Sequence, residues 1–299
     1  MAEDQVDQII SKMNGTGGQL ETDNRTDIEQ KGRFFFCDAK SQEQLNDFVT
    51  NEKPKLVVLV GFEGYGKSTF IGALYQQMIQ NQEYGGYSLV DSETYVGFER
   101  RVFLRRENRE NTSDTKRNIL RENDILDMLL LSEKGEKHRI LISDKAGETY
   151  RKYISSDEEV EKDIVMENAD MTLFFVDAEA DSKLLVDHNS IVQKYESLLD
   201  RLKTQDKIEE SMSYCIVFTK CDKVTTEEGR KKLAERKDKL CARFTELVGT
   251  NPYATYEVNS TDLENDELNK VFTLILKPSG YVEALSELDW VKMEIEKNK

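Results

Sequence analysis

The sequence contains few of the residues that build metal centres and disulfide frameworks. Its 299 residues include only four cysteines and two histidines, and the cysteines show no paired spacing. A zinc site is therefore not expected, and unpaired cysteines are typical of a reducing compartment. The first ten residues lack the basic and apolar regions of a secretory signal, and no apolar run is long enough for a membrane span. We expect a cytoplasmic protein.

Basic residues are also in deficit. The chain has 42 Lys and Arg against 58 Asp and Glu, which gives a formal net charge of -16. A broad nucleic-acid footprint needs a basic stripe that this negative field opposes, so no nucleic-acid partner is expected. A single phosphate ligand is still allowed, because backbone N–H groups and one lysine can attract it locally.

Polar segments divide the chain. Residues 1–31 are polar and glycine-bearing and predict a flexible lead. Residues 32–54 predict a short strand and helix that ends at Pro54. Residues 278–299 follow a Pro-Ser-Gly break and predict an amphipathic helix, which either docks on the main domain or engages a partner. The main domain is expected over residues 55–277.

Short apolar blocks alternate with amphipathic segments through this main domain. Continuous apolar blocks are typical of strands that are covered on both faces, and their alternation with helices indicates right-handed crossovers. The pattern predicts an α/β fold with a doubly wound, mostly parallel six-stranded sheet and helices on both faces. An insertion at about residues 84–118 should contain a further helix. The six predicted strands are 55–61, 126–132, 138–144, 171–177, 213–220 and 254–260.

A glycine-rich loop follows the first predicted strand. Gly61, Gly66, Lys67 and Ser68 match G-x-x-x-x-G-K-S/T between a strand and a helix, as the phosphate-binding loop requires. The glycines let the backbone approach a phosphate, Lys67 neutralises the outer phosphates, and Ser68 would bind Mg2+. The alternative, a glycine turn with a solvated lysine, does not explain the strand and helix around it. The residues predicted to bind the nucleotide here are Gly61, Glu63, Gly64, Tyr65, Gly66, Lys67, Ser68 and Thr69.

A D-x-x-G sequence stands at the end of the third predicted strand. Asp144 there could hold Mg2+ through a water, and the Gly147 N–H could contact a terminal phosphate. Alone, this short pattern also fits a surface turn. The phosphate-binding loop some 80 residues upstream favours the metal-site interpretation.

A T-K-x-D sequence ends the fifth predicted strand and bears on the base. Asp222 could accept hydrogen bonds from the ring N–H and the exocyclic amine of guanine, and adenine has no matching pair of donors. Lys220 would lay its aliphatic stem over the base, and Thr219 completes the motif. The alternative is a charged loop after a strand, which the order of the three motifs disfavours.

These motifs, in this order over about residues 55–276, resemble the first, third and fourth nucleotide-binding motifs of TRAFAC-class P-loop GTPases. The sequence DKAGE, the long insertion and the segment SETYVGFERR further resemble the bacterial double-GTPase type of domain, found in multigene conflict systems. The resemblance implies a P-loop G domain that binds GTP or GDP with Mg2+.

One residue departs from the pattern of small GTPases, and the position of another is ambiguous. Glu148 stands where those proteins have a glutamine that positions the attacking water. The resemblance implies that Glu148 could orient or deprotonate water, although a carboxylate there would also repel the γ-phosphate, and Glu148 could instead be an acid at a helix N-terminus. The threonine that closes over Mg2+ is Thr112 or Thr115, of which we favour Thr115 as a catalytic and metal-binding residue. Either threonine could be an ordinary loop hydroxyl.

Other candidates lie in the insertion and the last loop. Arg100, Arg101, Arg105 and Arg106 could supply an arginine finger in cis, but a solvated basic face is the favoured interpretation. Asn259 and Ser260 follow the last predicted strand and are the candidates for contacting the guanine carbonyl, although the usual small-residue-plus-lysine signature is absent.

Taken together, the sequence predicts a switch that binds GTP with Mg2+, hydrolyses it slowly and signals its nucleotide state to a protein effector or complex subunit. The alternative is a nucleotide-sensing interaction module of a multiprotein complex that hydrolyses little GTP. An ATP-dependent P-loop enzyme is disfavoured by the guanine motif.

Overall fold

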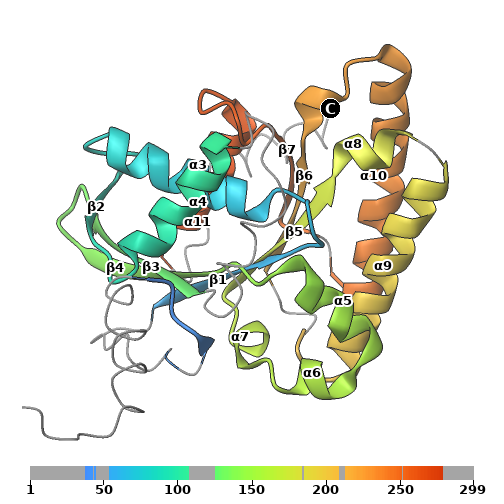
Figure 1. Ribbon diagram of the computed structural model, residues 1–299, viewed down its shortest axis with the longest axis horizontal. Helices are drawn as coiled ribbons and strands as arrows, with labels where there is room; N and C mark the ends of the chain where they lie inside the picture. The colour runs from blue at the N-terminus through green and yellow to red at the C-terminus, as the bar shows by residue number, and fades with distance from the viewer. Residues whose placement is uncertain are drawn as a thin grey trace, which may run out of the picture. The chain divides into compact units, whose positions relative to one another are not determined.

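A computed structural model describes residues 38–42, 44, 54–107, 125–183, 185–208, 213–250 and 252–278. Its centre is a seven-stranded sheet in the order β2-β3-β4-β1-β5-β6-β7 (Figure 1). The strands are β1 (Lys55–Val60), β2 (Tyr87–Asp91), β3 (Ile125–Ser132), β4 (Lys137–Ser143), β5 (Met171–Asp177), β6 (Tyr214–Thr219) and β7 (Ala254–Val258).

The helices connect these strands. They are α3 (Lys67–Gln80), α4 (Tyr95–Glu107), α5 (Gly147–Ser155), α6 (Asp157–Glu161), α7 (Ile164–Glu167), α8 (Ala178–Lys183), α9 (Leu185–Thr204), α10 (Glu227–Val248) and α11 (Asp266–Leu276), with a 3-10 turn, η3 (Cys221–Lys223). Among the described helices, none is long and apolar enough to cross a membrane.

The sheet is mostly parallel, as predicted. β1 pairs in parallel with β4 and β5, and β5, β6 and β7 continue in the same direction. β3 runs antiparallel to β4, and β2 runs antiparallel to β3. The predicted number of six strands was wrong because β2 was missed. β2 is a short edge strand that is half-buried or exposed along its whole length, so it lacks the continuous apolar block of the central strands.

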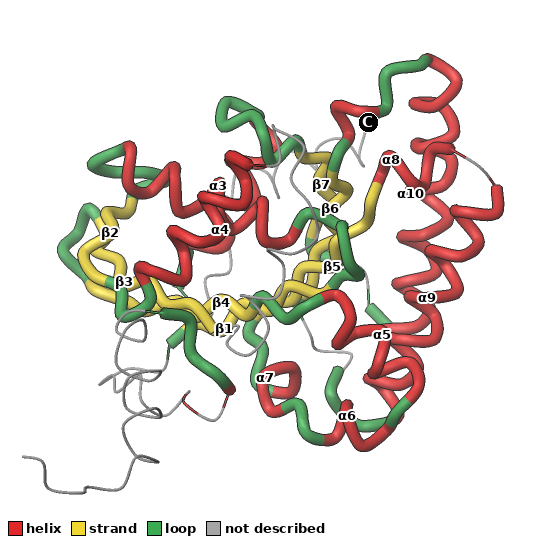
Figure 2. The backbone as a smooth tube through the Cα atoms, in the orientation of Figure 1, coloured by secondary structure: helices red, strands yellow, loops and turns green. Residues whose placement is uncertain are grey.

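Both faces of the sheet are covered by helices (Figure 2). Consecutive residues of β5 illustrate this, because side chains alternate between the faces of a strand. The Phe175 ring packs against Phe70 of α3, at 5.1 Å between ring centroids. The neighbouring Phe174 ring packs against Tyr195 of α9 and Phe244 of α10, at 6.3 and 5.0 Å. Helices α3, α4 and α11 therefore cover one face, and α5, α9 and α10 cover the other (Figures 1 and 2).

A buried lysine joins the first strand to the last described helix. The Lys55 ammonium, at the start of β1, donates to the carbonyl oxygens of Leu274, Ile275 and Lys277 at distances of 2.9, 3.0 and 2.8 Å. These are carbonyls at the end of α11, which have no partner within the helix. Lys55 thereby caps α11 and fixes it beside the central strand.

Several predictions fall outside the described residues. They are the lead at 1–31, most of the extension at 32–54, nearly all of the helix at 278–299, and both candidate threonines, Thr112 and Thr115. The predicted insertion helix corresponds to α4. The domain limits stay predictions.

Candidate functional site

The three motifs meet at the carboxyl ends of the central strands. β1 lies between β4 and β5, and the chain leaves β1 for α3 on one face of the sheet and leaves the neighbouring β4 for α5 on the other face (Figure 1). Such a topological switch point, outside the carboxyl ends of parallel strands, is where open α/β sheets bind ligands. The loop after β1, Asp144 after β4 and Lys220 after β6 all lie at this edge.

The loop of residues 61–66 has the backbone of an anion site. Gly64 and Gly66 have positive φ angles of 79° and 84°, which favour glycine. Gly66 is the N-cap of α3 and supplies no side-chain cap, so the first N–H groups of α3 have no side-chain acceptor there. These groups and the helix dipole favour a phosphate. The predicted residues Glu63 and Tyr65 lie in this loop, and Thr69 lies in the first turn of α3.

Lys67 lies inside the loop and is not a solvated lysine. Its residue is 6% exposed, and its ammonium donates to the Gly61 carbonyl oxygen at 2.5 Å. Burial lowers the pKa of Lys67, and the nearby carboxylates of Asp144 and Glu148 partly oppose this shift. Among the described residues no carboxylate lies within ion-pair distance of this ammonium, so an incoming phosphate would gain a strong electrostatic contact.

Asp144 binds two groups through one carboxylate oxygen. Ser68 Oγ donates to Asp144 Oδ2 at 2.9 Å, and Arg101 Nε donates to the same oxygen at 2.8 Å. Arg101 is only 1% exposed, so the predicted solvated basic face was wrong for this residue. The pattern could not show that a carboxylate from β4 neutralises it. Arg100 pairs with Asp38, and the side chains of Arg105 and Arg106 lie outside the description.

The donors present fit a magnesium ion. Ser68 Oγ and Asp144 Oδ2 lie 2.9 Å apart and are hard oxygen ligands, which Mg2+ prefers. The third predicted ligand, Thr115, lies outside the described residues.

Gly147 packs directly on the phosphate-binding loop. A Cβ atom added to Gly147 would lie 2.0 Å from the Glu63 nitrogen and 2.4 Å from the Phe62 carbonyl carbon. Only glycine allows this approach between the start of α5 and the loop. Glu148 follows in the first turn of α5, and within the described chain its side chain makes no hydrogen bond or ion pair. Its position suits an N-terminal helix acid, and its charge reaches Lys67.

A buried polar network beside the Asp144–Gly147 turn was missed by the sequence analysis. The Lys145 ammonium forms a buried ion pair with Asp163 at 2.7 Å, and the Tyr153 hydroxyl donates to the other Asp163 oxygen at 2.7 Å. Asp163 also accepts from the Val165 and Met166 amides at the start of α7. A lysine between Asp144 and Gly147 would ordinarily be solvated, and its partner lies 18 residues downstream in the sequence.

The guanine motif is tied to the phosphate loop. Thr219 Oγ1 lies 3.0 Å from the Tyr65 carbonyl oxygen and 3.2 Å from that of Val176, and it can donate to either. Lys220 has a positive φ of 59°, and its ammonium pairs with Asp177 at 2.5 Å. Asp177 was missed, although it ends an apolar strand at the same edge as the motifs.

Asp222 is exposed in η3, and its carboxylate has no hydrogen-bond or ion-pair partner in the part of the chain that the structure describes. It is therefore available to accept two hydrogen bonds. A carboxylate can do this because its two oxygens accept only.

The loop after β7 is closed on itself. Asn259 Oδ1 accepts from the Thr261 amide at 3.0 Å and from the Thr261 hydroxyl at 2.6 Å, which is an Asx turn. Ser260 is 7% exposed. β7 lies beside β6 in the sheet, so the loop follows the strand next to the guanine motif. Contacts from Asn259 and Ser260 to a base stay a prediction.

Comparison with solved structures gives distant likenesses. The signal recognition particle receptor SRb-GTP/SRX complex from Chaetomium thermophilum is 13% identical, with a TM-score of 0.42, and the match covers 75% of this chain and 98% of that one. A nucleolar GTP-binding protein 1 structure from Plasmodium falciparum is 12% identical, with a TM-score of 0.36, and the match covers 84% and 97%. No curated protein matches the sequence.

A family model is more specific. The model described as Double-GTPase 2 matches residues 55–274, well over half of the chain. The match includes every strand of the sheet and all three motifs at its edge. It confirms the resemblance to double-GTPase domains that the motifs indicated. The chain belongs to the Double-GTPase 2 family.

Proposed function

We propose that the protein is a switch that binds GTP with Mg2+, hydrolyses it slowly to GDP and phosphate, and signals its nucleotide state to a protein partner. The observation that carries the proposal is the meeting of Lys67, the Ser68–Asp144 pair and Gly147 at one end of the sheet. Membership of a GTPase family supports guanine-nucleotide binding.

The phosphates bind to the loop from Gly61 to Thr69, with Lys67 opposite the β- and γ-phosphates. Ser68, Asp144 and Thr115 would hold Mg2+, which would offset the charge that the phosphates carry. The Gly147 N–H lies at the start of α5 and would donate to the terminal phosphate. The close packing of Gly147 on Glu63 supports this role, because a movement of the phosphate-binding loop would displace the start of α5.

Guanine specificity comes from Asp222. Its exposed carboxylate accepts the two guanine donors, while the Lys220–Asp177 ion pair holds the aliphatic part of Lys220 at the base. Thr219 fixes the position of the phosphate loop relative to this motif through its hydrogen bond to the Tyr65 carbonyl. Asn259 and Ser260 complete the base site from the neighbouring strand end.

Hydrolysis uses Glu148 to orient water, helped by Lys67 and by Thr115. The Arg101–Asp144 ion pair and the negative charge of Glu148 also support a second candidate, a module that senses GTP and GDP with little turnover. In both cases a protein effector or complex subunit in the cytoplasm reads the nucleotide state. No nucleic acid is needed.

Two assays test the proposal. Removing the guanine acceptor in Asp222→Ala should weaken GDP binding by about 100-fold, because two hydrogen bonds to a charged group are lost. The affinity for ADP should not rise when the affinity for GDP falls. Lys223→Ala, in the same turn, is the matched control and should bind GDP as wild type does. Equal GDP affinity in Asp222→Ala and wild type would refute the base assignment.

Phosphate release from GTP separates the two candidates. Wild type should release phosphate above the level of a Lys67→Ala control, and Glu148→Ala should release it more slowly than wild type. If wild type binds GTP but releases no more phosphate than Lys67→Ala, the sensing module is the correct function.

A further inference from the structure

The Arg101 guanidinium is the least expected group at the site. It comes from α4, in the insertion, and it is 1% exposed. Nε donates to Asp144 Oδ2 at 2.8 Å, and Nη1 donates to the Gly97 carbonyl oxygen at 2.9 Å. Nη2 is buried and has no hydrogen-bond partner among the described residues. A buried donor left without a partner is costly.

The shape of a guanidinium fixes where the unpaired donor points. Nε–H and one Nη2–H are parallel and lie on the same edge of the planar group. Because Nε points at Asp144, the free Nη2–H points toward the same side, where the Ser68–Asp144 pair lies. A cationic edge therefore faces the position at which the proposed function requires Mg2+.

The charges at this position are already balanced without a metal. Asp144 has one negative charge, and its side chain is 3% exposed. One of its oxygens accepts from both Ser68 and Arg101. A divalent cation held by this carboxylate would be close to a buried guanidinium of like charge, where bulk water does not screen the repulsion. Arg101 and a metal ion therefore disfavour each other at Asp144.

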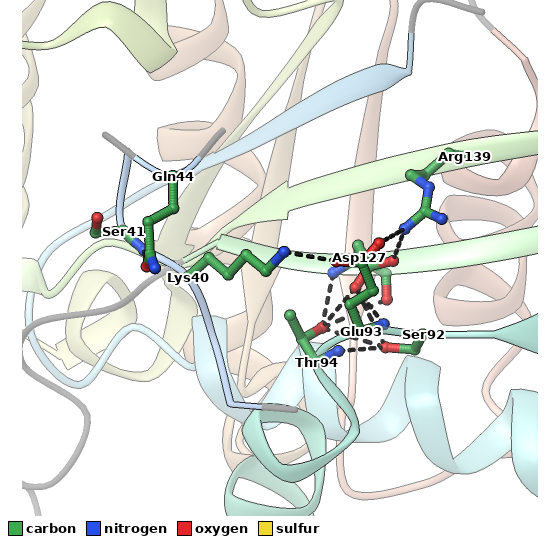
Figure 3. Close-up of polar contacts among 8 residues, drawn as sticks. All are labelled: Lys40, Ser41, Gln44, Ser92, Glu93, Thr94, Asp127 and Arg139. Carbon is green, nitrogen blue, oxygen red and sulfur yellow. Dashed lines mark hydrogen bonds and ion pairs between the residues drawn. The ribbon is translucent and has the colours of Figure 1, made fainter. Parts of the chain in front are cut away.

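The base of α4 is held firmly in place (Figure 3). The buried Asp127 carboxylate accepts from the Glu93 amide at 2.8 Å and from Thr94 Oγ1 at 3.2 Å, just before α4 begins. Arg139 forms ion pairs with Asp127 and Glu93, and Lys40 pairs with Glu93 at 2.6 Å. This cluster anchors the N-terminal end of α4 to β3 and β4.

Arg101 itself lies where α4 touches the phosphate-binding helix. A Cβ atom added to Gly72 of α3 would lie 3.0 Å from the Arg101 carbonyl oxygen. The two helices are thus in backbone contact at Arg101. A change in the Arg101 ion pair would therefore shift the middle of α4, next to the nucleotide site, while the N-terminal end of the helix stays anchored.

We propose that Arg101 is an internal counter-ion for Asp144 that competes with Mg2+, so that metal loading releases α4 at Arg101. The inference rests on the proposed function, because it requires a nucleotide and a metal at the Ser68–Asp144 pair. It assigns the insertion helix as the element that responds to the metal.

The test is a Mg2+ titration of GDP affinity with three variants. Arg101→Gln keeps a hydrogen-bond donor for Asp144 and removes the charge, Arg101→Lys keeps the charge, and Arg100→Gln removes a charge from the same helix away from Asp144. Competition predicts that Arg101→Gln needs at least about tenfold less Mg2+ for half-maximal GDP affinity, since a charged hydrogen bond no longer opposes the metal. Arg101→Lys and Arg100→Gln should stay near wild type.

An unchanged Mg2+ requirement in Arg101→Gln would overturn the inference. A higher requirement would also overturn it and would make Arg101 a support that positions Asp144 for the metal. Absence of GDP binding by wild type at any Mg2+ concentration would instead overturn the proposed function and the inference with it.

Hydrogen exchange on wild type covers the case in which Arg101→Gln does not fold. Adding Mg2+ to the GDP complex should speed amide exchange in the half of α4 that follows Arg101, relative to the anchored residues at its start. Unchanged or slower exchange there would overturn the inference without any variant.

Discussion

Substituting Gly147 by alanine gives opposite predictions from helix propensity and from packing. Alanine favours a helix over glycine by up to about 1 kcal/mol, and Gly147 is the first residue of α5, with no positive φ to demand glycine. On propensity alone, Gly147→Ala should stabilise the protein. The added Cβ, however, would lie 2.0 Å from the Glu63 nitrogen.

The size of the clash sets the expected loss. Ordinary contact begins at 3.4 Å, so α5 and the phosphate loop must separate by more than 1 Å. Both sides of the contact are backbone, which cannot rotate away as a side chain can. Overpacking typically costs about 1–3 kcal/mol, and the melting temperature should fall by roughly 2–4 °C for each kcal/mol lost. GDP affinity should fall at least about tenfold, because the loop is displaced.

Thermal melting by circular dichroism and GDP titration would measure both effects. Gly135→Ala is the matched control, because Gly135 has a φ of 82° and nothing within 4 Å of an added Cβ. That variant should lose stability through backbone strain while its GDP affinity stays at the wild-type level. If Gly147→Ala melts at or above the wild-type temperature and binds GDP as tightly, the packing argument is refuted.

Three further outcomes are expected. Thr219→Val removes a buried hydroxyl that donates to the Tyr65 or the Val176 carbonyl and should cost about 1 kcal/mol of stability and weaken GDP binding. Thr219→Ser should behave as wild type, and calorimetry that finds no difference between wild type and Thr219→Val would contradict this. Lys55→Met leaves the end of α11 uncapped and should cost about 1–3 kcal/mol in urea unfolding, and an unchanged midpoint would refute the capping role. Burial raises the pKa of the Cys215 and Cys221 thiols to about 12, so at pH 8 iodoacetamide should label them in unfolded but not in native protein; rapid native labelling of Cys221, followed by mass spectrometry, would contradict it.

Local patterns were enough for the parts of the site that follow one another along the chain. The phosphate loop is recognisable because a buried strand, fixed glycines and a helix start occur within twenty residues, and each demands particular residue types. The five central strands were found for the same reason, since burial on both faces requires apolar blocks, and the edge strand β7 was found from its short run ATYEV. β2 has an exposed edge and carries a weaker signal.

The groups that sequence reasoning missed all depend on contacts between distant segments. Arg101 is buried because Asp144, 43 residues away, neutralises it. The acceptors of Lys55 lie more than 200 residues away in the chain. Charge and hydropathy alone predict that such residues are solvated. Their burial follows from the order of strands in the sheet, which places their partners beside them.

The most direct test of the central claim is a pair of calorimetric titrations on nucleotide-free wild type, one with GDP and one with ADP, in the same Mg2+ buffer. A base site built around the Asp222 carboxylate should bind GDP at least about 100-fold more tightly than ADP, because adenine leaves the hydrogen-bond acceptors unpaired. Equal or tighter binding of ADP would contradict the assignment of this site to guanine nucleotides.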